Sequence, residues 1–200
     1  MTIKLVLAER SEQPSIPGQR EPLAPGQDGY IHLRYRKAPT GWQHPYVFIY
    51  LHNNSDRDLY CTLLDMTDRF RCHSRLFPGD LIPAGRTAVA YEGRAIDISV
   101  PQQRLEAGGT EVYDWLKLIA AEQRFASDGY ELPNLDGFIT PRRVTRGLGP
   151  RSVLDRLADR AVTRDAGDEA TGAPEWTTTL MTIHTYCPPV STPPDRPAPP

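Results

Sequence analysis

The sequence predicts a mainly β protein: an antiparallel β-sandwich, immunoglobulin-like or jelly-roll-like, with one α-helical insertion and disordered termini. Apolar runs recur about every ten to fifteen residues, a spacing typical of sandwich strands. Turn residues such as Asn53-Asn54-Ser55 and Pro78-Gly79 separate these runs. The last 14 residues, CPPVSTPPDRPAPP, contain seven prolines, a composition that favours an extended or disordered tail over a packed strand.

The N-terminal part divides into a segment with connector, residues 1 to 28, and the start of the sandwich domain, residues 29 to 186. A short strand is expected at residues 3 to 8, and residues 10 to 28 follow with four prolines. In residues 30 to 37 the apolar side chains alternate with polar ones, which is the period of a half-buried strand.

The middle of the chain contains further strand candidates. Residues 46 to 51 and 59 to 64 are β-branched and aromatic runs on either side of a polar turn, so they are interpreted as a hairpin. A strand at residues 70 to 77 is expected to end at Pro78-Gly79. Two more follow at residues 87 to 91 and 95 to 100.

Residues 110 to 124, TEVYDWLKLIAAEQR, fit both helical and strand spacing, and the periodicity alone favours a helix. Residues 122 to 173 form an Arg-rich insertion, in which residues 152 to 162 predict one amphipathic helix capped by Ser152. Residues 176 to 186 alternate again and are expected to form the closing strand. Residues 187 to 200 form the proline-rich tail.

The overall composition limits the classes of partner and location that the chain can have. The chain has 23 basic and 25 acidic residues and a net charge of −2, which gives no overall attraction to nucleic acid or anionic membranes. The cysteines, Cys61, Cys72 and Cys187, are odd in number and lack CxxC spacing. The N-terminal apolar run is too short for an export signal. We therefore expect reduced thiols, a cytoplasmic location and no membrane span.

Adjacent Cys72 and His73 raise the hypothesis of a cysteine hydrolase. Such a site needs a histidine within hydrogen-bond reach of the thiol. In a strand, neighbouring side chains point to opposite faces, so the pair is interpreted as part of a strand and no catalytic residue is predicted. A hydrolase would require His32, His44 or His52 to lie beside Cys72 or Cys61.

Three ligand-binding patterns are weak. Asn54, Asp56, Asp58 and Asp65 imitate a calcium loop, but Leu59 stands where that loop needs glycine. Residues 147 to 152, GLGPRS, imitate a dinucleotide fingerprint without a preceding strand. The five histidines are scattered, so neither a metal site nor a cofactor is predicted.

Residues 141 to 164 carry seven arginines and two aspartates, a local charge of 7 − 2 = +5. Two readings remain open: a solvated helix with internal ion pairs, or a surface for an acidic partner, a ligand or RNA. Few aromatic residues interleave to stack bases, so nucleic-acid binding is the less favoured alternative. The candidate partner-binding residues are Arg142, Arg143, Arg146, Arg156, Arg160 and Arg164.

Four stretches resemble the β-sandwich region that follows the catalytic domain in bacterial caspase-like (metacaspase-type) cysteine peptidases. These are VFIYLHNNSDRDLYCTLLD, LFPGDLIPAGRTAVAYEG, GTEVYDWLKLIAAEQRFASDGYELPNLDG and EWTTTLMTIHT. YDWLKLIAAEQRF with LPNLDG is the most specific of them, and the resemblance spans about residues 45 to 186.

The resemblance implies a strand at residues 115 to 121, and on that basis a strand is preferred there over a helix. It also implies a non-catalytic accessory or protein-binding domain, with the caspase-like catalytic domain as a candidate partner. The His-Gly and Cys motifs of that catalytic domain are absent from this sequence. The chain is therefore expected to be either a detached C-terminal portion or a stand-alone relative.

Overall fold

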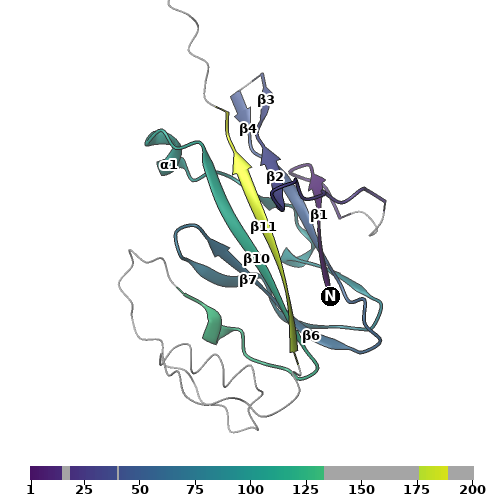
Figure 1. Cartoon of the computed structure of the whole chain (residues 1–200). Helices are drawn as coiled ribbons and strands as arrows, with labels where there is room; N and C mark the ends of the chain where they lie inside the picture. The colour runs from purple at the N-terminus through teal and green to yellow at the C-terminus, as the bar shows by residue number, and fades with distance from the viewer. Residues whose placement is uncertain (15–18, 40, 133–175, 189–200) are drawn as a thin grey trace, which may run out of the picture.

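The computed structural model describes residues 1–14, 19–39, 41–132 and 176–188. They form two packed sheets and a small hairpin (Figure 1), so the expected mainly β sandwich is confirmed. Sheet A has the order β1 (Thr2–Ala8), β5 (Tyr46–His52) and β8 (Thr87–Val89), and β9 (Ile96–Asp97) also pairs with β5.

The larger sheet, sheet B, has five strands, and its first pair is parallel while the others are antiparallel. Their order is β2 (Tyr30–Arg34), β11 (Trp176–Tyr186), β10 (Glu111–Ala121), β6 (Leu59–Thr67) and β7 (Cys72–Ile82). The remaining elements are β3 (Arg36–Ala38), β4 (Gly41–Gln43), η1 (Tyr91–Gly93), α1 (Gln102–Glu106) and η2 (Asp128–Tyr130).

The main core lies between the two sheets, because each strand sends alternate apolar side chains inward. Leu5, Ile49, Leu63, Leu118 and Ile183 are members of this core, and none is more than 1% exposed. Burying a side chain of this size contributes about 1.5–3 kcal/mol each before the entropy cost. The predicted alternation in β2 is confirmed, since Ile31 and Leu33 are buried while His32 and Arg34 are exposed.

The outward faces of the two sheets differ along their length in how deeply their side chains are buried. On sheet A, Phe48 and Tyr50 are buried in a second cluster with Val6 and Ala8. On sheet B, Leu64, Cys72, Ile119 and Ala121 are buried with Phe125, which follows β10. The other end of the outward face of sheet B carries partly and fully exposed side chains.

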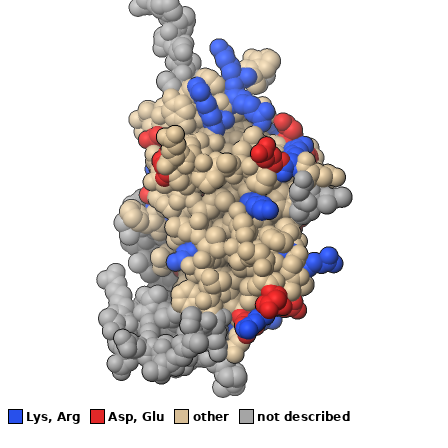
Figure 2. Space-filling view, turned by 45° about the vertical axis from the view of Figure 1, so that its right-hand side comes forward, with Lys and Arg blue, Asp and Glu red and all other residues tan. Residues whose placement is uncertain are grey.

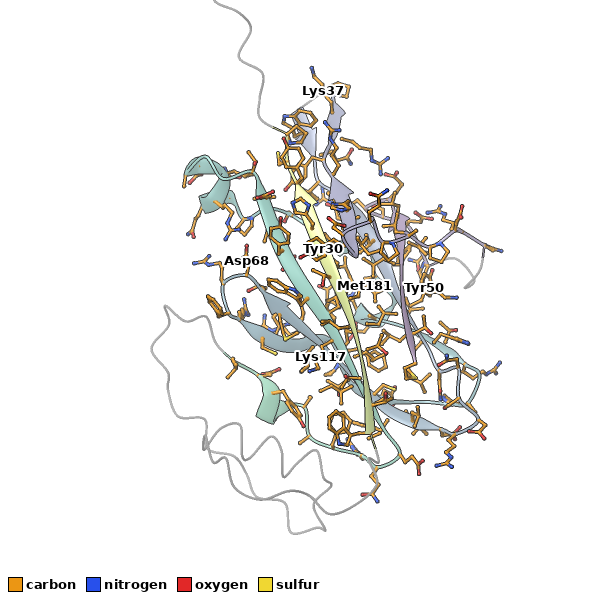
Figure 3. The ribbon with its side chains drawn as sticks, in the orientation of Figure 1. Tyr30, Lys37, Tyr50, Asp68, Lys117 and Met181 are labelled. Carbon is orange, nitrogen blue, oxygen red and sulfur yellow. The ribbon has the colours of Figure 1, made fainter. Side chains whose placement is uncertain are left out.

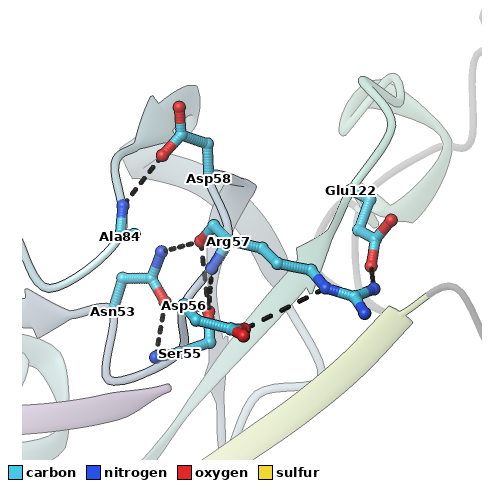
Figure 4. Close-up of polar contacts among 7 residues, drawn as sticks. All are labelled: Asn53, Ser55, Asp56, Arg57, Asp58, Ala84 and Glu122. Carbon is cyan, nitrogen blue, oxygen red and sulfur yellow. Dashed lines mark hydrogen bonds and ion pairs between the residues drawn. The ribbon is translucent and has the colours of Figure 1, made fainter.

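The expected hairpin of residues 46 to 64 is wrong, because β5 lies in sheet A and β6 in sheet B. The connection is an inter-sheet corner built around Asn53, which is fully buried. Its Nδ2 donates to the Arg57 carbonyl and its Oδ1 accepts from Ser55 (Figure 4). The Nδ2 also donates to the Ile82 carbonyl. A buried amide with all these partners fixes the angle at which the chain changes sheets.

The predicted end of a strand at Pro78-Gly79 is also wrong, since β7 runs on to Ile82. The pairing of β6 with β7 shifts register on either side of Leu63. Such bulges accommodate a proline and a glycine inside a strand.

Residues 111 to 121 form a strand, as the resemblance implied and against the helical periodicity. β10 pairs on one side with β11 and on the other with β6. The predicted helix at residues 152 to 162 lies outside the described residues, and so does the tail from residue 189. Cys187 and Pro188, expected in that tail, are buried, and the Cys187 amide donates to Thr110.

None of the helices in the described part of the chain is long and apolar enough to cross a membrane.

Candidate binding face of the larger sheet

Cys72 and His73 lie on opposite sides of β7. Cys72 packs into the outward cluster with Phe125, and burial raises the pKa of its thiol to about 11. The Nε2 of His73 lies 3.4 Å from the Asp65 Oδ2 across the strand pair. A thiol that keeps its proton at neutral pH is a poor nucleophile.

The other histidines named as candidate bases have partners of their own. His44 Nε2 lies 2.8 Å from the Tyr46 hydroxyl, and His52 Nδ1 lies 3.0 Å from Thr87 Oγ1. Cys61 is fully buried, and burial raises the pKa of its thiol to about 12. Within the described residues, which include every histidine and cysteine of the chain, no imidazole is hydrogen-bonded to a thiol.

Acidic side chains gather at one end of the interior. Burial, followed by the charges of Asp65 and Asp68, raises the pKa of Asp114 to about 7. Burial also raises the pKa of Asp65 and lowers that of His73. Arg104 of α1 forms an ion pair with Asp68, which Figure 3 places beside α1. Within the described residues one oxygen each of Asp65 and Asp68 has no hydrogen-bond partner, and a buried polar atom without a partner costs free energy.

At its other end, the outward face of sheet B presents partly or fully exposed aromatic and imidazole rings, and we call this end the open face. Outward side chains of β2, β10 and β11 form it, among them Tyr30, His32, Tyr113, Trp115, Leu180 and His184, and Lys117 lies opposite Leu180 on the same face. Tyr113 stacks on Trp115 with centroids 6.5 Å apart, and Tyr30 meets Tyr113 edge-on at 5.9 Å. Figure 3 shows Tyr30 beside β10 and β11. Leu180 is 58% exposed.

Two histidines lie together on the open face. His32 of β2 and His184 of β11 are directly opposite in the parallel register, and their Nδ1 atoms are 3.1 Å apart. Each Nε2 meets a carboxylate, Asp28 beside His32 and Glu111 beside His184, both at 3.0 Å. The Tyr113 ring lies 4.6 Å above that of His184, at 10°.

Charged side chains are unevenly distributed over the surface. In the view of Figure 2, lysines and arginines project at one end and a mixed cluster lies at the other, with few charges between. The corner residues Asp56, Arg57 and Glu122 form one such mixed cluster, in which Arg57 is paired with both acids.

The six candidate arginines, Arg142, Arg143, Arg146, Arg156, Arg160 and Arg164, lie outside the described residues, as does the GLGPRS motif. The calcium pattern is not assembled, since Asp58 accepts from the Ala84 amide at 2.9 Å while Asp65 belongs to the interior cluster. In the ranges that the structure describes, no three His, Cys, Asp or Glu side chains come together to hold a metal ion.

Sequence reasoning missed the open face as a unit. Alternation placed His32 and His184 each on one face of its strand, but 152 residues separate them. The parallel pairing of β2 with β11 brings them together, and no spacing rule reports the partner of a strand.

The fold and this face define a β-sandwich protein with one aromatic, histidine-bearing sheet surface. No protein-family model matches the chain, and no curated protein matches it either. The likeness to the sandwich region of caspase-like peptidases therefore stays a prediction.

Proposed function

We propose that this chain is a non-catalytic binding domain that recognises a protein partner through the open face of sheet B. The observation that carries the proposal is the row of partly exposed rings on this sheet surface. Tyrosine and tryptophan are enriched where proteins bind one another, because they bury a large apolar area and keep a polar tip. The buried, high-pKa Cys61 and Cys72 thiols favour recognition over covalent chemistry.

The partner proposed first is the catalytic domain of a bacterial caspase-like peptidase. The resemblance of residues 45 to 186 to the region that follows such domains supports this choice. A face on which aromatic and imidazole rings outnumber basic side chains such as Lys117 suits a protein surface better than a phosphate backbone, which is recognised mainly by basic side chains.

The test is binding of the purified chain to a caspase-like catalytic domain from the same genome, measured by biolayer interferometry in EDTA. Trp115→Ala and Tyr113→Ala are each expected to weaken binding tenfold or more, as for central aromatic residues of an interface. Phe70→Ser is the matched control, because Phe70 is an aromatic residue, 71% exposed, in the turn between β6 and β7.

Two results would overturn the proposal. One is equal binding by the Trp115, Tyr113 and Phe70 variants. The other is peptide hydrolysis by the chain alone that disappears in Cys72→Ala.

A further inference from the structure

We propose that His32 and His184 form a binding site for a divalent transition-metal ion of the Zn²⁺ class. Their Nδ1 atoms are 3.1 Å apart. Two nitrogen ligands of one tetrahedral zinc ion, each at about 2.05 Å, are separated by about 3.3 Å. A small rotation of either ring therefore suffices to admit the ion. His32 has room for that rotation, since its side chain is 48% exposed.

The carboxylates behind the rings match the surroundings of known metal-binding histidines. A ligating histidine almost always donates its second ring N–H to a carboxylate, carbonyl or water, which orients the ring and makes it a better ligand. His32 has Asp28 in this position and His184 has Glu111. Asp28 is itself fixed, because the Tyr30 amide donates to its Oδ1 at 3.1 Å.

The surrounding backbone leaves space for this arrangement. A Cβ atom added to Gly26 would lie 2.9 Å from Asp28 Oδ1 and 3.0 Å from the His32 ring. On the other side, the stacked Tyr113 ring holds the plane of His184. Both imidazoles are therefore positioned by neighbours as well as by the pairing of β2 with β11.

The hydrogen-bond pattern can direct both Nδ1 atoms toward one point between the rings. If each Nε2–H donates to its carboxylate, both Nδ1 atoms present a lone pair to each other. Two facing lone pairs at 3.1 Å repel unless a proton or a metal ion lies between them. Binding of Zn²⁺ between the rings would form two Zn–N bonds.

Two imidazoles fill only part of a tetrahedral shell. Among the described residues no third donor side chain joins them, so water or a donor from another molecule completes the coordination. Such a site exchanges its ion more readily than a closed structural site with four protein ligands. This inference does not depend on the proposed partner, although both concern the open face.

The test is calorimetric titration of the metal-free chain with ZnCl₂ at pH 7.5, with no partner present. One Zn²⁺ per chain is expected. His32→Asn and His184→Asn should each weaken binding at least tenfold, and the double variant should not bind. Asp28→Asn should weaken binding about tenfold, as loss of a supporting carboxylate does.

His44→Asn is the matched control, because His44 also faces a carboxylate, Asp97 at 3.3 Å, but has no second imidazole. It should bind zinc as the unaltered chain does. Circular dichroism checks that each variant is folded. Absence of saturable binding by the unaltered chain, or the same affinity in the double variant, would overturn the metal site. Neither result bears on partner binding measured in EDTA.

Discussion

Asp114 lies on the inward side of β10, where Asp65 and Asp68 add negative charge and Arg104 offsets part of it. The pKa of this carboxyl rises from 3.8 to about 7. The folded protein therefore keeps a proton that the unfolded chain releases near pH 4. The stability contributed by Asp114 is fully present below pH 4 and is lost as the pH rises to about 7.

Removing the negative charge of Asp114 should restore the stability that is lost at high pH. Asp114→Asn is expected to raise the free energy of unfolding at pH 8 by on the order of 2 kcal/mol, after allowing for partial exposure, and to leave it unchanged near pH 4. Urea denaturation at the two pH values measures both numbers.

Comparing the two pH values also distinguishes the effect of Asp114 on the free energy of unfolding from the effects of its neighbours. The raised pKa of Asp65 acts in the same direction. The lowered pKa of His73 acts in the opposite direction, because stability is lost as the pH falls below 6.5. Asp56→Asn is the control, since that carboxylate is 95% exposed. A pH-independent effect of Asp114→Asn would contradict the assignment.

β7 depends on a glycine at its bulged segment. Gly79 has φ +144°, and an added Cβ would lie 2.3 Å from the Tyr60 hydroxyl oxygen and 2.9 Å from Cζ. Gly79→Ala is expected to lower the free energy of unfolding by about 2–3 kcal/mol, because strain in the backbone and a clash add. Urea denaturation measures the loss.

Gly85→Ala is the matched control for this element. Gly85 also has a positive φ, +66°, but nothing lies within 4 Å of an added Cβ. Gly85→Ala should lower the free energy of unfolding by about 1 kcal/mol, because only backbone strain contributes. Equal losses at the two glycines would mean that contact with Tyr60 contributes nothing.

Individual strands were easier to predict than their partners. Alternation identified β2 and β11, and apolar runs identified β1, β5 and β6. The sequence of β10 fits two periods, so periodicity favoured a helix. Asn53 was interpreted as part of a hairpin turn, because local turn chemistry does not show that the next strand joins the other sheet. Register, corner and bulge all depend on contacts between distant residues.

In the molecule as a whole, a long stretch of sequence separates the two neighbouring strands β10 and β11. β10 and β11 pair along all 11 residues of each, with Ala121 opposite Trp176. Residues 133–175 lie between them in sequence and contain all six candidate arginines. Replacing this stretch with a Gly/Ser linker of about 15 residues should leave the sandwich folded, because the entropy cost of closing a connection changes only slowly with its length.

The shortened chain also tests the alternative role of the arginines. Heteronuclear NMR should show the shifts of β1, β5 and β10 unchanged, with zinc binding retained. Loss of dispersed signals would mean that the stretch supports the core. Loss of a partner in a folded shortened chain would move recognition from the open face to the arginines.

The parallel pairing of β2 with β11 sets an order of events on the ribosome. His32 is translated 152 residues before the His184 that it faces, a delay of about 8–30 s at ordinary rates of synthesis. Throughout that time the nascent chain carries an unpaired strand with Ile31 and Leu33 uncovered. Chaperones that hold exposed strand edges are thus expected to engage this protein during translation and to leave it once β11 emerges.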